Sequence, residues 1–183
     1  MEIVFIRHAE KEQGEGDLPL SENGKKQAKN LAKRLKKEQF DEFYCSELLR
    51  SRETSRFVSE TVNLNPLVEP SLNEFEPTLL KTDPEMWGEK ETKQYQALRS
   101  FLTNFTKRGD ENKRILIIAH GNTNRLILII LLELNLKNII RFRLLETGIS
   151  EVYWMPKFKN WRMKYWGDVS HQPKELVEGV NTY

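Results

Sequence analysis

Two apolar runs in this chain end in the same way, and that repeat constrains the fold more than any other feature. Residues 2–6 (EIVFI) precede Arg7 and His8, and residues 114–119 (RILIIA) precede His120. Short apolar runs rich in β-branched residues predict buried strands. Ligands in open α/β sheets bind at the carboxyl ends of the strands. If these two strands are neighbours, two histidines and an arginine are therefore expected at one site.

The other elements are predicted from hydrophobic periodicity and turn residues. Helices are expected over about 22–38, 46–62, 92–107 and 122–134, and further strands over 40–46, 67–70, 140–145, 150–155 and 161–166. Strands that alternate with helices indicate a three-layer α/β/α fold with a largely parallel central sheet. The last three strands have no helices between them, so that edge of the sheet is expected to be antiparallel.

We expect one domain over residues 1–183, because this length suits a single hydrophobic core. Within it, residues 71–91 contain two prolines and many carboxylates, and we interpret this irregular segment as an insertion that faces the substrate. Residues 167–183 are expected to form a loose tail.

The composition excludes several classes of protein. The net charge is only +2, and the lysine-rich segment 25–37 has apolar residues at helical spacing, so it predicts a solvated helix face and no nucleic-acid partner. No apolar run approaches the roughly 20 residues of a membrane-spanning helix, and no signal peptide is expected. The single cysteine, Cys45, excludes an intrachain disulfide and a cysteine-based zinc site, and it favours a cytoplasmic location.

The residues at the predicted strand ends suit an anion, and phosphate above all. Arg7 is a permanent cation with a planar donor fork, and Arg50 and Arg52 follow the second predicted strand at a helix start. Gly121 opens another helix, where backbone N–H groups add donors. A metal would need three good ligands, which the sequence does not visibly supply because the two strand-end histidines are far apart in the chain. No metal is therefore expected.

Beside a phosphate, a neutral histidine can act as a nucleophile, because nearby arginines lower its pKa and keep its lone pair free. The leaving oxygen then needs a proton, which a carboxylic acid kept neutral by burial can give; Glu74 and Glu76 are the candidates. Taken alone, His120 could be a core histidine, Arg50 could form an ion pair on its helix, and Glu74 could be a surface carboxylate. Their joint placement favours a site.

Together these segments resemble the histidine phosphatase superfamily, whose members are phosphoglycerate mutase-like. The matching segments are RHAE (7–10), DLPLSENGKKQA (17–28), CSELLRSRETS (45–55), LNE (72–74), IIAHGNTNR (117–125) and TGIS (147–150). The resemblance implies a phosphoglycerate mutase-like fold with no metal and no organic cofactor. It implies that His8 is the phosphorylated nucleophile, that Glu74 gives the proton, and that Arg7, Arg50 and His120 hold the phosphoryl oxygens.

The expected activity is hydrolysis of a small phosphorylated metabolite. A phosphoglycerate mutase is the first alternative, because HGN at 120–122 and LNE at 72–74 are mutase-like. Against it, the E-R-x-Y-G continuation of mutases is missing after Glu74, and Lys81 is the only basic residue between Asn63 and Lys90. A phosphohistidine-protein or phosphoprotein phosphatase and a phosphate-binding regulatory module are further alternatives, and a homodimer is left open.

Overall fold

The centre of the structure, a computed structural model that describes residues 1–75, 83–107 and 112–177, is a mixed β-sheet. Within these residues the sheet has six strands in the order β3-β2-β4-β1-β5-β6. The strands are β1 (Glu2–Arg7), β2 (Glu42–Cys45), β3 (Leu67–Val68), β4 (Arg114–Ala119), β5 (Ile149–Met155) and β6 (Asn160–Asp168). Strands β3, β2, β4 and β1 pair in parallel, whereas β5 pairs antiparallel with β1 and β6 pairs antiparallel with β5. The predicted type of sheet, largely parallel with an antiparallel edge, is confirmed.

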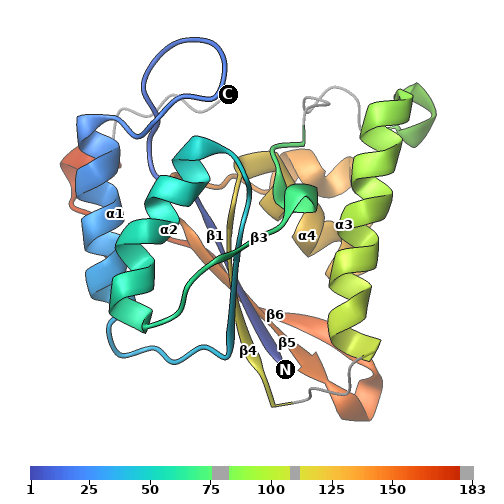
Figure 1. Cartoon of the computed structure of the whole chain (residues 1–183). Coiled ribbons are helices and arrows are strands. Elements are labelled where there is room, and N and C mark those ends of the chain that lie inside the picture. Colours follow the sequence, from blue (N-terminus) through green and yellow to red (C-terminus); the bar gives the residue numbers. More distant parts are fainter. Residues whose placement is uncertain (76–82, 108–111, 178–183) are drawn as a thin grey trace.

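Helices cover both faces of this sheet (Figure 1). The α-helices are α1 (Glu22–Leu35), α2 (Leu49–Val62), α3 (Glu89–Lys107) and α4 (Gly121–Leu131). Short 3₁₀ helices are η1 (Pro70–Leu72), η2 (Pro84–Met86), η3 (Leu136–Arg141), η4 (Pro156–Phe158) and η5 (Lys174–Leu176). Helices α1 and α2 lie on one face and α3 and α4 on the other, so the predicted three-layer architecture is confirmed.

Each face of the sheet has its own apolar core, because successive side chains of a strand point to opposite faces. On β1, Ile3 and Phe5 belong to the cluster under α3 and α4, whereas Val4 and Ile6 belong to the cluster under α1 and α2. All four are almost completely buried. Burial of side chains of this size stabilises the fold by about 1.5–3 kcal/mol each.

The lysines of segment 25–37 are exposed, and those within α1 lie on its outer face, as the spacing of the apolar residues predicts. Ala28, Leu31, Ala32 and Leu35 are buried. Ser21 caps the helix, and its hydroxyl oxygen accepts a hydrogen bond from the N–H of Gly24 at 3.0 Å. Among the described residues, no helix has the length and apolar character needed to cross a lipid bilayer.

Strands β1 and β4 deliver the two strand-end histidines to the same place. They are direct neighbours, and their register pairs Arg7 with Ala119. The next residue after each strand is a histidine, and the backbone N–H of His8 still donates to the carbonyl of Ala119 at 2.9 Å. Parallel pairing in this register therefore brings side chains more than a hundred positions apart to one edge of the sheet.

The predicted strand at 140–145 is wrong. The alternation of apolar and basic residues there looks like a strand, but the segment is η3 followed by an irregular connection. Its carbonyl groups accept hydrogen bonds from distant side chains instead of from a neighbouring strand. Arg125 donates to the carbonyl of Phe142, Trp166 to that of Arg143, and Arg7 to that of Leu144.

The predicted loose tail is wrong for its described part. Strand β6 runs as far as Asp168, and the residues that follow pack against α1. The side-chain amide of Gln172 donates to the carbonyl of Gln27 and to the hydroxyl of Thr147, both at 2.9 Å, and Gln27 donates to the carbonyl of Leu176 at 2.9 Å. Residues 178–183 lie outside the described residues.

The segment 71–91 is described only at its two ends, since residues 76–82 lie outside the described residues. Before the gap, Phe75 is buried in the core under α3 and α4. After it, Trp87 stacks edge-to-face on Phe75, with the ring centroids 5.2 Å apart, and on Tyr95 of α3, at 5.1 Å. These aromatic contacts anchor both ends of the segment to α3.

Candidate active site

The imidazole of His8 is held in one orientation and one tautomer directly after β1. Its Nδ1 lies 2.6 Å from the carbonyl oxygen of Ala9, which can only accept, so Nδ1 carries the proton. The Nε–H of Arg50 donates to the free Nε2 at 3.2 Å. Burial, and then the charges of Arg7 and Arg50, hold the pKa of His8 well below its usual value. The ring is therefore neutral near pH 7, with its lone pair on Nε2.

His120 packs against His8, with the ring centroids 4.9 Å apart at an angle of 62°. The hydroxyl of Ser46 lies 2.6 Å from Nε2 of His120 and accepts from the N–H of Leu48 at 3.1 Å. This hydroxyl can therefore donate its own proton to Nε2, which leaves the ring proton on Nδ1. Within the described part of the chain, that Nδ1 is buried and has no hydrogen-bond partner. Burial, and then the neighbouring His8 and arginines, lower the pKa of His120 well below its usual value.

Two arginines flank the histidines and are positioned by different elements. Arg50, in the first turn of α2, is buried, and its guanidinium lies 3.6 Å from Asp17. Arg7, the last residue of β1, pairs with the buried carboxylate of Glu146 at 2.5 Å and donates to a carbonyl at 2.7 Å. Gly121, the first residue of α4, lies beside Arg7, since a Cβ there would stand 3.6 Å from the arginine Nε. Arg52 is exposed, so Arg50 is the arginine that α2 contributes.

Glu74 enters the site from the segment after η1. One of its carboxylate oxygens accepts a hydrogen bond from the N–H of Asn122 at 3.0 Å, near the start of α4. The backbone on either side is fixed by Thr123, whose hydroxyl donates to the carbonyl of Asn73 and accepts from the N–H of Phe75. Removal of the carboxyl group from water raises the pKa of Glu74 above its usual value, although Arg7 and the N–H of Asn122 oppose this shift. Glu76, the other predicted acid, lies outside the described residues.

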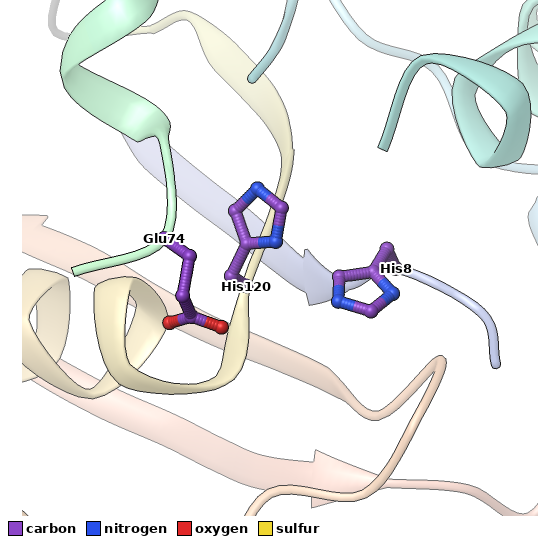
Figure 2. A group of neighbouring side chains, drawn as sticks. All are labelled: His8, Glu74 and His120. Atoms are coloured by element: carbon purple, nitrogen blue, oxygen red, sulfur yellow. The ribbon is translucent and has the colours of Figure 1, made fainter. Parts of the chain in front are cut away.

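Figure 2 shows His8, Glu74 and His120 converging from three different segments of the chain.

The loop that carries His8 is fixed against α1. The hydroxyl of Ser21 donates to the carboxylate of Glu10 at 2.5 Å, and the N–H of Glu10 donates to Gln27 at 2.8 Å. A Cβ on Gly24 would come within 1.9 Å of the carbonyl oxygen of Glu10, so only glycine permits this contact. These contacts with Glu10 hold the segment at 17–28 against the segment at 7–10, which carries His8.

Comparison with known proteins identifies the family of this constellation. A family model described as the histidine phosphatase superfamily (branch 1) matches residues 3–80 and 76–169. The chain belongs to the histidine phosphatase superfamily. Phosphoserine phosphatase 1 of Hydrogenobacter thermophilus is 28% identical, over 78% of this chain and 81% of that protein. Phosphoglycerate mutase-like protein 4 of Arabidopsis thaliana is 28% identical, over 93% of this chain and 86% of that protein.

Solved structures of histidine phosphatases share the fold of this chain. A phosphoserine phosphatase mutant from Entamoeba histolytica, solved in complex with phosphoserine, matches it with a TM-score of 0.73 at 21% identity. That match covers 94% of this chain and 99% of the other. At this level of identity the similarity establishes the fold, including the mixed sheet, and leaves the substrate to be argued from the site.

The structure brings together three side chains that could ligate a metal, which the sequence did not reveal. His8, Glu74 and His120 each offer one ligand atom, and these atoms lie within 4.8 Å of one another. The surroundings of this histidine phosphatase site favour an anion instead. Nε2 of His8 already accepts a hydrogen bond from a guanidinium group, and the buried side chain of Arg50 adds a positive charge at the same place. That no metal is needed stays a prediction.

Sequence reasoning missed the orienting roles of three residues at the site. Ser46 bonds His120, Glu146 pairs with Arg7, and Thr123 holds the segment that carries Glu74. Ser46 directly follows β2, so the rule that sites gather at the carboxyl ends of strands could have found it. Glu146 has no such signal, because it lies in the irregular connection just after residues 140–145, which were predicted as a strand.

Proposed function

We propose that this chain is a metal-independent phosphomonoester hydrolase that forms a phosphohistidine intermediate on His8. The observation that carries the proposal is the state of His8: its Nδ1 donates to a carbonyl, and its Nε2 keeps a lone pair beside Arg50. A neutral imidazole held in this way is a ready nucleophile. The positive charge that the ring gains on attack is then stabilised by the hydrogen bond from Nδ1 to the carbonyl of Ala9.

In the first step, Nε2 of His8 attacks the phosphorus of the ester, and the bond from phosphorus to the leaving oxygen breaks. Arg7, Arg50, Nδ1–H of His120 and the N–H of Gly121 hold the three remaining phosphoryl oxygens. Charge on these oxygens is what a phosphoryl-transfer enzyme must stabilise. Glu74, whose raised pKa favours the protonated form, gives its proton to the leaving oxygen as the alcohol departs.

In the second step, water attacks the phosphorus of the phosphohistidine. Glu74, now ionised, takes a proton from this water, the bond from phosphorus to Nε2 breaks, and inorganic phosphate leaves. His8 and Glu74 are thereby returned to their starting states. The relatives named as a phosphoserine phosphatase and a phosphoglycerate mutase-like protein are consistent with a small phosphorylated substrate.

The test is direct detection of the intermediate. Wild-type protein quenched in alkali within its first turnovers is expected to carry one additional phosphoryl group by intact-mass analysis, and acid should remove it. His8→Ala should carry none while it unfolds at a similar temperature. Turnover without this adduct, or an adduct on the His8→Ala variant, contradicts the proposal. EDTA should leave the rate unchanged, and strong inhibition by EDTA would point to the metal instead.

A phosphoglycerate mutase is the second candidate, and the mutase-like relative favours it. A mutase passes the phosphoryl group from the histidine to a second hydroxyl instead of to water. Incubation with 3-phosphoglycerate distinguishes the two, since a hydrolase releases inorganic phosphate and a mutase yields the 2-isomer. A regulatory module that only binds phosphate would give neither product and no phosphohistidine.

A further inference from the structure

A cavity opens directly beside the catalytic cluster, on the side of Glu74. Its volume is about 580 Å³, and Arg50 and Glu74 form part of its wall. In the proposed reaction Glu74 protonates the leaving oxygen, so the rest of the leaving group must lie on this side of the phosphorus. The cavity is therefore the place where the alcohol part of the substrate binds.

The opposite wall of this cavity is one stripe of α3. Lys90, Lys93, Gln94 and Ala97 line it, and their spacing of i, i+3, i+4 and i+7 places them on one face of the helix. Gln94 fixes this face against the catalytic segment, because its amide donates to the carbonyl of Asn73 at 2.8 Å. The stripe thus places two lysines along the cavity, and its small fourth residue leaves room.

Neither lysine is explained by the stability of α3. Lys90 lies in the first turn of the helix, where the helix dipole favours anions and disfavours a cation. Lys93 pairs with Glu89 at 2.5 Å, but both side chains are more than 70% exposed, and exposed pairs of this kind contribute little. Both ammonium groups can therefore turn toward a ligand at low cost.

Other charged groups near the cavity are already engaged. Asp17, also on its wall, accepts from the N–H of Leu49 at 2.8 and 3.0 Å and so caps the start of α2. Arg125, on α4, donates to a carbonyl and to the side chain of Asn122. The two lysines of α3 are thus the cations best placed to meet a second charge on the substrate.

We infer that Lys90 and Lys93 form an anion subsite for the leaving group, so that the preferred substrate is a phosphomonoester whose alcohol part carries a second anionic oxygen group, a carboxylate or a phosphate. The inference rests on the proposed function, because it assumes that the phosphoryl group lies against His8. It assigns substrate selection to the face of α3 that Gln94 bonds to the segment carrying the catalytic acid.

Three aryl phosphates that differ in one meta substituent test the subsite. The substituent is a carboxylate, a phosphonate or a neutral carboxamide, and kcat/KM is measured at constant ionic strength on the wild type, on Lys90→Met/Lys93→Met and on the matched control Lys26→Met/Lys29→Met. The control removes two exposed lysines of α1. Because the same esters are compared on each protein, differences in their intrinsic reactivity cancel.

The wild type is expected to prefer an anionic ester over the carboxamide by about tenfold, as one or two charge-assisted hydrogen bonds would give. Lys90→Met/Lys93→Met should lose that preference, and the control should keep it. The larger of the carboxylate and phosphonate preferences identifies which anion the subsite takes. Equal ratios on the wild type and on Lys90→Met/Lys93→Met overturn the inference.

Binding of uncleavable analogues separates this inference from the proposed function. Calorimetry with the benzylphosphonates that carry the same substituents should give a Kd on the wild type about tenfold lower for the anionic analogue, and this difference should vanish in Lys90→Met/Lys93→Met. If no ester is hydrolysed but the difference in Kd remains, the proposed function fails and the subsite stands. If esters are hydrolysed through phosphohistidine but all analogues bind equally, the subsite fails alone.

Discussion

Charged side chains gather at both ends of the neighbouring strands β1 and β4, and the two ends differ in how those charges are compensated. At the amino ends, Arg114 contacts the carboxylates of Glu2, Glu38 and Glu151 at 3.1, 2.5 and 3.2 Å. The buried Glu151 also pairs with Lys164 at 2.7 Å. At the amino ends of the strands, positive and negative side chains therefore pair with one another.

At the carboxyl ends, positive charge gathers around two neutral rings. Burial, and then the charges of Arg7 and Arg50, lower the pKa of His8, and burial together with His8 and the same arginines lowers that of His120. Within the described residues, the buried Nδ1 of His120 has no hydrogen-bond partner. Burial of unpaired polar atoms beside cations costs free energy unless a ligand completes the site. At the amino ends the charged groups pair with one another and stabilise the fold. At the carboxyl ends Arg7 and Arg50, although they contact Glu146 and Asp17, also adjoin two neutral rings, which is the arrangement that the proposed phosphate site requires.

The largest effect is expected from Arg50→Met. Removal of the guanidinium deletes a donor to Nε2 of His8 and a charge beside the phosphoryl oxygens, so kcat/KM for an aryl phosphate should fall by about 10³-fold. Arg52→Met is the matched control, because Arg52 lies two positions away on the same helix and is exposed. A similar loss in both variants would mean that positive charge on α2, and not a contact at the site, explains the effect.

Glu74→Gln should slow substrates according to their leaving group. Esters of aliphatic alcohols need a proton on the leaving oxygen, so their kcat should fall by about 10²-fold, whereas p-nitrophenyl phosphate should lose much less. In the wild type, the rate with aliphatic esters should decline as pH rises, because Glu74 is active only while protonated, and its raised pKa extends that range upward. Glu74→Gln should lack this decline. If Glu76→Gln alone produces the leaving-group dependence, the acid is Glu76.

Arg114→Met tests the other end of the comparison. The substitution leaves the carboxylate of Glu151 buried with fewer positive partners, so the free energy of unfolding should drop by about 2–3 kcal/mol. This loss is smaller than for a fully buried ion pair because Arg114 is partly exposed. Since the site lies at the opposite ends of the strands, kcat/KM of the folded protein should stay within about twofold. Urea unfolding and the aryl phosphate assay measure both quantities. A variant with unchanged stability and impaired turnover would mean that the amino ends of the strands serve catalysis and not stability.

The sequence was sufficient for features that depend on local pattern and strand register. The strand-end positions of His8 and His120 follow from two apolar runs. The pattern around α2 left both Arg50 and Arg52 as candidates, and the family resemblance chose Arg50, which is the buried one. The sequence failed where the backbone depends on side chains from distant elements. Residues 140–145 have the alternation of a strand, but side chains from three other elements bind their carbonyls. A periodicity argument contains no information about such contacts.

The smallest expected effect is on stability at acid pH. All three histidines have lowered pKa values in the folded protein; that of His171 is about 4. Below the unfolded value of about 6.5, the unfolded chain binds protons that the folded chain does not, so the free energy of unfolding falls as pH falls.

Each histidine that stays neutral in the folded state contributes up to about 1.4 kcal/mol per pH unit to this loss. His120→Gln removes one of these groups, so the difference in unfolding free energy between pH 6.5 and 5.5 should be smaller than in the wild type by about 1 kcal/mol, because the unfolded group is already half protonated at pH 6.5. Vanadate or phosphate should protect the wild type, because an anion between the rings favours their protonated forms. An identical pH dependence in both proteins would mean that His120 titrates in the folded state as it does in the unfolded chain, so that burial beside His8 and the two arginines does not keep its ring neutral.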